Sequence, residues 1–293
     1  MIRETVKAWV QASRPPFYIA TLIPLVIGWL MAKETGWHTG RFCLVLVGSL
    51  IVHLLTNLAN DYFDHIKGTD SGASIGGSRV IQEGKISPRT VLKTIIALYG
   101  IALCIALYAM IRFDLFSTIP LVLFAWFSSL FYVAPPIRYG YHGLGELFVG
   151  INMGPVMVVG TYWVVTGHPA WSPLYVSIPV GLMVASILYY QSLPDIKADR
   201  VSGKYTLAVK LGKKRAFVGL IFFWVVTYLA VLLLTYSGLL SWVAVASLAS
   251  TPVFMKMIRI VKETENWLLL DRYGKYVRLL YFFNGLAIIA SLL

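Results

Sequence analysis

Two short stretches place aspartates directly after apolar runs that are long enough to cross a membrane. The first stretch holds Asp61, Asp64 and Asp70, and the second, in the other half of the chain, holds Asp195 and Asp199. A charge at membrane depth costs a few kcal/mol, so carboxylates here require a functional reason. Carboxylates that come together repel one another unless cations lie between them. The residue types therefore indicate a cation site.

The spacing of these residues predicts two polar stripes on helices. At 100° per residue one helical face carries the first stripe, which consists of His53, Asn57, Asn60, Asp61 and Asp64. The second stripe has members four residues apart, namely Gln191, Asp195 and Asp199, and Pro194 is expected to break its helix. Both stripes leave the other helical faces apolar, so we expect them to meet at one end of a helical bundle.

The ligand chemistry favours Mg²⁺ with a bound diphosphate. Oxygen ligands without His or Cys pairs select Mg²⁺, which completes its shell with water and phosphate oxygens. Basic residues close to the aspartates would repel the bare ion but would bind an anion that bridges it; they are Lys67, Arg79, Arg138 and Lys204. At the mouth of an apolar bundle such an anion is a lipid diphosphate. Its departure leaves an allylic cation for an electron-rich acceptor, and this is prenyl transfer.

Two loops add candidate substrate contacts. Several glycines precede and follow Arg79, and their backbone N–H groups can approach a phosphate closely; a flexible connector is the alternative interpretation. The stretch 131–146 is dense in Tyr, Arg and His, and Tyr139 is a candidate for cation stabilisation or acceptor orientation. An anchor at the membrane interface remains the alternative for Tyr139. His53 is expected to be a satisfied buried side chain.

The composition places these stripes in a polytopic membrane protein with an all-α fold. Of the 293 residues 58% are hydrophobic and only 13% are charged. We predict one domain, residues 1–293, with nine spans and an active-site cap on the cytoplasmic side. The predicted spans are 16–33, 41–59, 92–111, 115–134, 144–165, 173–193, 214–236, 239–257 and 276–293.

The distribution of basic residues predicts the orientation. With nine spans, 22 of the 25 Lys and Arg residues fall on one side, and only Lys33, Arg41 and Arg112 fall on the other. The positive-inside rule then predicts a cytoplasmic N-terminus and active site in the plasma membrane. The net charge of +12 is explained by orientation and by anionic lipid or phosphate, so no nucleic-acid partner is expected. No obligate protein partner is inferred.

The two aspartate motifs resemble those of the UbiA superfamily of intramembrane prenyltransferases, over nearly the whole chain. Within it the chain is similar to MenA-type 1,4-dihydroxy-2-naphthoate polyprenyltransferases. The resemblance is carried by 57–62, 67–70, 79–88, 141–146, 154–162 and 199–207. It implies Mg²⁺-dependent transfer from a polyprenyl diphosphate to an aromatic acceptor, with decarboxylation.

The resemblance also implies roles for particular residues. Mg²⁺ and diphosphate would be held by Asn60, Asp61, Asp64, Asp195 and Asp199, with Arg79 and Lys204 on the phosphates and Asn57 supporting the metal shell. Two positions depart from the family pattern. Gly68 stands where 4-hydroxybenzoate enzymes carry a third acidic residue, and 191–195 reads Gln-Ser-Leu-Pro-Asp instead of Asn-Asn-x-Arg-Asp. These departures leave acceptor identity more open than prenyl transfer.

Three other functions compete with this interpretation. The acceptor could instead be 4-hydroxybenzoate, homogentisate, haem or a glycerol-phosphate lipid. A cation transporter would also place carboxylates in the membrane, but its ion path should continue to the far side, where the predicted loops carry few charges. A structural membrane protein leaves both acidic stripes unexplained.

Overall fold

The computed structural model describes residues 2–69 and 76–293, and every regular element in these ranges is a helix. The all-α fold class is confirmed. The first half contains α1 (Ile2–Ser13), η1 (Pro15–Phe17), α2 (Ile19–Met31), η2 (Lys33–Thr35), α3 (Thr39–Lys67), α4 (Pro88–Phe113), η3 (Phe116–Thr118), α5 (Ile119–Phe131) and η4 (Tyr139–His142). The second half contains α6 (Gly145–Ile151), η5 (Asn152–Val156), α7 (Met157–Thr166), α8 (Trp171–Ser192), α9 (Ile196–Val201), α10 (Leu207–Tyr236), η6 (Trp242–Ser250), α11 (Thr251–Glu263), η7 (Trp267–Tyr273) and α12 (Lys275–Leu292).

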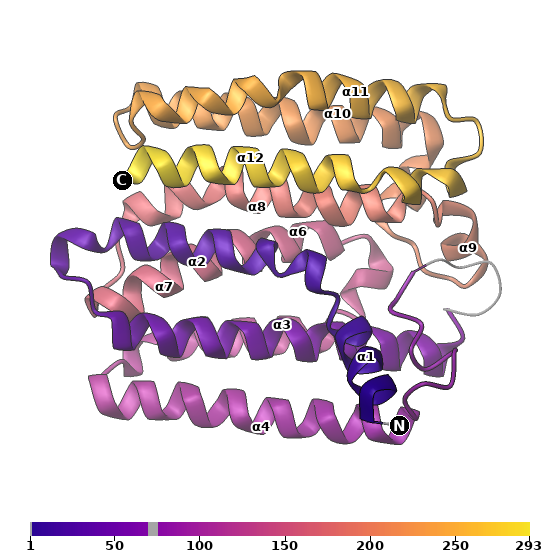
Figure 1. The fold of residues 1–293 in the computed structure, drawn as a ribbon, viewed down its shortest axis with the longest axis horizontal. Helices are drawn as coiled ribbons and strands as arrows, with labels where there is room; N and C mark the ends of the chain where they lie inside the picture. Colours follow the sequence, from indigo (N-terminus) through magenta and orange to yellow (C-terminus); the bar gives the residue numbers. More distant parts are fainter. Residues whose placement is uncertain (1, 70–75) are drawn as a thin grey trace.

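The long helices run side by side along one axis, and the two chain ends lie at opposite ends of the bundle (Figure 1). In the described ranges seven helices are long and apolar enough to cross a membrane. The segment 3–17 and α2 make an eighth only if they count as one span bent by 54°. The segment Phe116–Phe131 is apolar but shorter than a full span. Each of the nine predicted stretches is helical, but a count of nine spans is not confirmed.

Local sequence signals explain where several helices begin and end. Ser87 caps α4 by accepting a hydrogen bond from the backbone N–H of Thr90, and Pro88 takes the first helical position. Asp114 ends α4 in the left-handed conformation. Pro194 lies in the break between α8 and α9, as its missing N–H and fixed ring predict.

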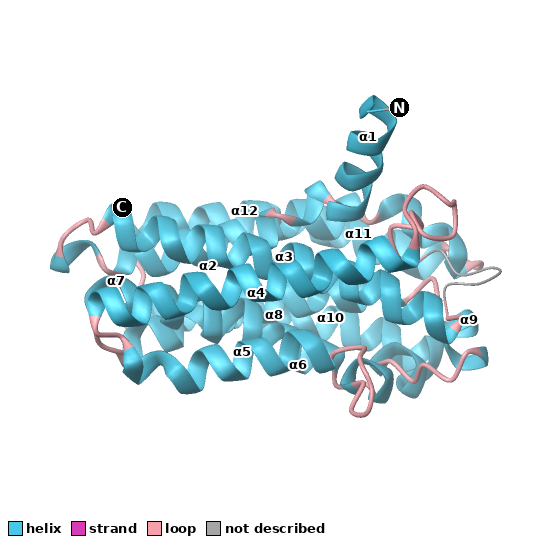
Figure 2. Cartoon of the chain, turned by 90° about the horizontal axis from the view of Figure 1, so that it is seen from below, coloured by secondary structure: helices cyan, strands magenta, loops and turns pink. Residues whose placement is uncertain are grey.

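The bundle has one main apolar core and a smaller one under the N-terminal helix. The main core joins α2, α8, α10 and α12 around the fully buried side chains of Met183, Trp224 and Tyr281. The smaller core packs Ala8 and Ala12 of α1 against Leu58 of α3 and Ile81 of the following segment. Helix α1 projects away from the bundle axis (Figure 2). The turn after it brings Arg14 to the end of the bundle where α9 lies.

Candidate active site

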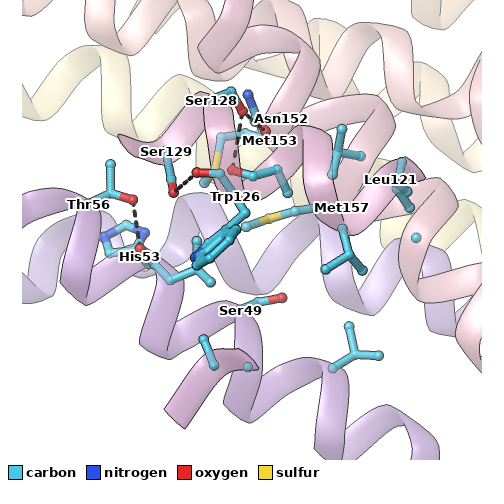
Figure 3. A pocket seen from close by; sticks show the side chains of 18 of the residues that line it. Ser49, His53, Thr56, Leu121, Trp126, Ser128, Ser129, Asn152, Met153 and Met157 are labelled. Atoms are coloured by element: carbon cyan, nitrogen blue, oxygen red, sulfur yellow. Dashed lines mark hydrogen bonds between the residues drawn. The ribbon is translucent and has the colours of Figure 1, made fainter. Parts of the chain in front are cut away.

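Two adjoining cavities meet near the end of the bundle that carries α9, at the right in Figure 1. A polar pocket of about 130 Å³ lies at this end. An apolar cavity of about 440 Å³ continues from it among the helices (Figure 3). The residues that line both are Arg14, Asn60, Tyr132, Leu188 and Gln191. A polar head and an apolar tail can therefore occupy one continuous site.

The polar pocket brings both acidic stripes together. Asn60 and Asp64 come from α3, and Asp195 and Asp199 come from the break before α9 and from α9 itself. All three aspartates are buried. Sequence spacing predicted this meeting, although the two motifs lie far apart in the chain.

The donor set of this pocket fits Mg²⁺. The Oδ1 atom of Asn60 is buried and has no hydrogen-bond partner in the described part of the chain. Such an oxygen is suited to binding a metal ion or a ligand. Among the described residues no three His, Cys, Asp or Glu side chains are close enough to enclose an ion alone. The carboxylates line a pocket with room for water and phosphate oxygens, which are the partners that complete the shell of Mg²⁺.

Asp64 of the pocket contacts both a lysine and a tyrosine. Lys204 Nζ forms an ion pair with Asp64 Oδ2 at 3.0 Å, and the Tyr141 hydroxyl donates to Asp64 Oδ1. The Tyr141 ring also lies beneath Lys67, whose Nζ is 3.6 Å from the ring centroid. Burial acts to lower the pKa of Lys204, but the carboxylates of Asp64 and Asp199 outweigh it and raise this pKa above its usual value. Lys204 is therefore cationic.

Asp61 has different contacts from those that the family resemblance implied. It is 1% exposed and lines neither cavity in the described ranges. Arg14 and the backbone N–H of Ser78 donate to Asp61 Oδ1, and the Ser78 hydroxyl donates to Asp61 Oδ2. Asp61 thus ties the end of α1 and the segment after the undescribed residues to α3. Its geometry indicates a positioning residue, since its oxygens are already occupied by protein donors.

Two predicted residues line the apolar cavity. Tyr139 is buried, and its hydroxyl donates to the Ser128 carbonyl at 2.6 Å, so its ring and not its oxygen is available to a ligand. The Tyr139 ring packs against Phe148 with centroids 4.4 Å apart. Asn57 lies one turn before Asn60 on the wall of the same cavity. The ring of Tyr139 thus lies on the cavity wall, where it can contact an apolar chain or a cation.

Three predicted basic residues do not line either cavity in the described ranges: Lys67, Arg79 and Arg138. Arg79 and Arg138 both have positive φ angles, 64° and 45°, which non-glycine residues rarely adopt. Such strained backbone gathers at functional sites. Asp70, which belongs to the first predicted aspartate stretch and was a candidate substrate-binding residue of the site, lies outside the described residues.

Arg14, Tyr132 and Glu146 line the polar pocket and are among the residues that sequence reasoning did not assign to the site. Arg14 has a positive φ of 51° and turns its side chain into the site just before η1. In the sequence Arg14 directly precedes an apolar stretch. The positive-inside rule accounts for an arginine at such a position, so Arg14 was not considered as a site residue. Glu146 is buried at the start of α6, where Ser192 makes a long contact of 3.5 Å with it.

Comparison with known proteins agrees with this geometry. The model of the UbiA prenyltransferase family matches residues 21–267. A 1,4-dihydroxy-2-naphthoate octaprenyltransferase of Bacillus subtilis (strain 168) is 29% identical over 82% of this chain and 77% of its own. A 2-carboxy-1,4-naphthoquinone phytyltransferase of Synechocystis is 28% identical over 98% of this chain and 93% of its own.

The fold also has solved counterparts. The structure of a UbiA homologue from Archaeoglobus fulgidus bound to GPP and Mg²⁺ superimposes with a TM-score of 0.60 at 16% identity, covering 97% of this chain and 99% of that one. At this identity the likeness concerns the fold. The family match extends over most of the chain and includes both aspartate motifs, so the chain belongs to the UbiA prenyltransferase family.

Proposed function

We propose that this protein transfers a polyprenyl group from a polyprenyl diphosphate to 1,4-dihydroxy-2-naphthoate, with loss of CO₂ and with Mg²⁺ as cofactor. The observation that carries the proposal is the junction of a carboxylate-lined pocket with an apolar cavity of about 440 Å³. This junction suits a diphosphate head with a long hydrocarbon tail. The naphthoate acceptor is supported by the names of relatives that match most of the chain.

The chain's own residues suit the demanding step, which is the departure of diphosphate. Asn60, Asp64, Asp195 and Asp199 would hold Mg²⁺, and bound Mg²⁺ supplies charge stabilisation for the leaving diphosphate. Lys204 adds a fixed positive charge beside the same pocket. The ring of Tyr139, on the apolar side, offers its π face to a developing allylic cation.

We also propose the setting of the enzyme. The whole chain, residues 1–293, forms one domain, because α12 packs back on α2: the Tyr281 hydroxyl donates to the Ala20 carbonyl at 3.2 Å. The active site and the N-terminus face the cytoplasm in the plasma membrane, as the distribution of basic residues predicts. Exposed apolar side chains along the bundle contact membrane lipid.

The decisive experiment incubates the detergent-purified protein with geranylgeranyl diphosphate, Mg²⁺ and 1,4-dihydroxy-2-naphthoate, and detects the prenylated, decarboxylated naphthoquinol by mass spectrometry. Product is expected from the wild type and should disappear with EDTA and in Asp64→Asn and Asp195→Asn. Lys210→Gln is the matched control, because Lys210 Nζ donates to the exposed His142 carbonyl and Lys210 lines neither cavity in the described ranges.

Other outcomes assign the protein differently. Product with 4-hydroxybenzoate or homogentisate, and none with the naphthoate, would keep prenyl transfer and replace the acceptor. No turnover of any prenyl diphosphate would overturn the proposal and favour a cation transporter.

A further inference from the structure

Four polar side chains on the wall of the apolar cavity carry buried atoms without a hydrogen-bond partner in the described ranges. They are Arg14 Nε, His53 Nε2, Asn57 Nδ2 and Trp126 Nε1, and the Asn60 Oδ1 atom described above lies beside them. A buried polar group without a partner costs about 1–3 kcal/mol, so it is unusual in a folded protein. Several such groups on one cavity wall indicate a ligand that carries polar atoms.

His53 is held in place on this wall. Its Nδ1 atom is 2.7 Å from the Thr21 hydroxyl, and the Tyr18 ring meets it edge-on with centroids 5.1 Å apart. These contacts fix the ring, and Nε2 is left without a hydrogen-bond partner in the described ranges. In Figure 3 His53 projects from α3 into the space that Trp126 borders from α5. The expectation that His53 is fully satisfied is therefore wrong for one of its two nitrogens.

The positions of these groups define a row that leads away from the metal pocket. His53, Asn57 and Asn60 lie on one face of α3, and a rise of about 1.5 Å per residue places His53 about 10 Å along the helix from Asn60. Asn60 belongs to the polar pocket as well. A planar two-ring molecule with its reacting carbon near the diphosphate would reach along this row.

The remaining walls of the cavity have the opposite character. Helices α4, α5 and α7 contribute Ile105, Leu121, Val122 and Met157. A prenyl chain laid along the α3 row would leave the His53 and Asn57 atoms unpaired, because it has no polar groups beyond its diphosphate. Laid along α4, α5 and α7 it meets mostly apolar side chains, and the hydroxyls of Ser128, Ser129 and Thr161 on these helices already donate to backbone carbonyls. Hydrogen bonding therefore favours the acceptor on the α3 wall and the prenyl chain on the wall formed by α4, α5 and α7.

We propose that the α3 face with His53 and Asn57 binds the aromatic acceptor, and that His53 Nε2 hydrogen-bonds the 4-hydroxyl on the reacting ring of this acceptor. This inference rests on the proposed function and adds an acceptor-binding residue to it. Asn57 contacts the middle of the same molecule. The Thr21 hydroxyl acts through His53 and is a positioning group.

The test measures steady-state kinetics for both substrates in His53→Leu, His53→Gln and Thr56→Val. In His53→Leu the KM for the naphthoate should rise about tenfold, the loss expected for one hydrogen bond, while the KM for geranylgeranyl diphosphate stays within about twofold. His53→Gln, which restores a polar atom, should recover part of the loss. Thr56→Val is the matched control, because Thr56 lines the cavity but its hydroxyl already donates to the Val52 carbonyl at 2.7 Å.

An acceptor lacking one hydroxyl supplies the second arm. With 1-hydroxy-2-naphthoate the wild type should lose affinity, and His53→Leu should add no further loss, because the hydrogen bond is already missing. Acceptor binding without prenyl diphosphate, measured by calorimetry, checks both variants independently of turnover. Wild-type turnover with an unchanged naphthoate KM in His53→Leu and His53→Gln would overturn this inference and leave the proposed function intact. A wild type that neither binds nor converts the naphthoate would overturn both.

Discussion

At the scale of residues, Asp61 and Asp64 are neighbours in one motif but have different surroundings. Asp64 lines the polar pocket, whereas Asp61 is enclosed by Arg14 and Ser78. We predict that Asp61→Asn lowers the free energy of unfolding by about 3 kcal/mol, since it leaves Arg14 part-buried without its anion. The Mg²⁺ concentration for half-maximal activity should stay near the wild-type value. Thermal unfolding in detergent and a Mg²⁺ titration measure the two effects.

The matched control for this prediction is Asp64→Asn, which should raise the Mg²⁺ requirement or abolish activity. A double-mutant cycle of Asp61→Asn with Arg14→Gln should show coupling, because the two side chains form one ion pair. A raised Mg²⁺ requirement in Asp61→Asn, with unchanged stability, would instead make Asp61 a metal ligand.

Tyr141 gives a prediction with a defined pH dependence. Burial raises the pKa of the Tyr141 hydroxyl, and the neighbouring Asp64 carboxylate raises it further. A phenol with a raised pKa keeps its proton until the pH climbs above that value, so it remains a donor to Asp64 between about pH 6 and 9. Tyr141→Phe should therefore lower kcat/KM by about tenfold, and by the same factor at every pH in this range. A factor that shrinks towards pH 9 would contradict this assignment.

Sequence reasoning found the carboxylates of the site more readily than their partners. Asp64, Asp195 and Asp199 were predictable because charge next to an apolar run has few structural explanations. Arg14 was not, since the turn that aims it depends on a positive φ and on the docking of α1, which single-sequence patterns do not encode. The unpartnered nitrogen of His53 could not be predicted either. Which of the two ring nitrogens has a hydrogen-bond partner depends on the contact with Thr21 of α2.

At the scale of elements, close contact between α8 and the segment formed by α6 and η5 shapes one side of the site. A Cβ on Gly154 would lie 2.7 Å from the Gly181 Cα, and one on Gly181 would lie 2.5 Å from the Gly150 carbonyl oxygen. Backbone atoms cannot give way as a flexible side chain can. We predict that Gly154→Ala and Gly181→Ala each destabilise the protein by about 1–3 kcal/mol. Thermal unfolding in one detergent compares them with the wild type.

Gly100 provides the contrast for these substitutions. It lies inside α4, and a Cβ there would have no atom within 4 Å. Gly100→Ala should leave stability unchanged or raise it by about 0.5–1 kcal/mol, because alanine restricts the unfolded chain. Equal losses at positions 100, 154 and 181 would mean that the effect comes from changing any helical glycine and not from close helix packing.

The elements themselves followed from sequence better than their lengths. The Ser87 cap, the Asp114 turn and the break at Pro194 are set by residues within a few positions, so a local pattern contains the information. The predicted count of nine spans is not confirmed, because α2 and α5 have only 13 residues each and are shorter than the apolar stretches that contain them. Hydropathy extends across the turns at their ends, where the backbone changes to 3₁₀ geometry.

At the scale of the whole molecule, the orientation in the membrane connects the site to its substrates. The two chain ends lie at opposite ends of the bundle, and the site shares its end with α9 (Figure 1). The loops predicted for this side carry 22 of the 25 basic residues. A protein inserted by the positive-inside rule would thus keep this end in the cytoplasm, where a water-soluble acceptor can reach the diphosphate head of a prenyl donor that lies in the membrane.

Single cysteines test this orientation. With Cys43 and Cys104 replaced by alanine, one cysteine is placed at Val201, which is 90% exposed at the end of α9, or at Glu34, exposed in η2 at the other end of the bundle. A membrane-impermeant maleimide should label Glu34→Cys in intact spheroplasts and should label Val201→Cys only after permeabilisation. The two variants control for each other, because both side chains are accessible in detergent. The reverse pattern would put the site on the outer face, and the acceptor would then have to be supplied from outside the cell.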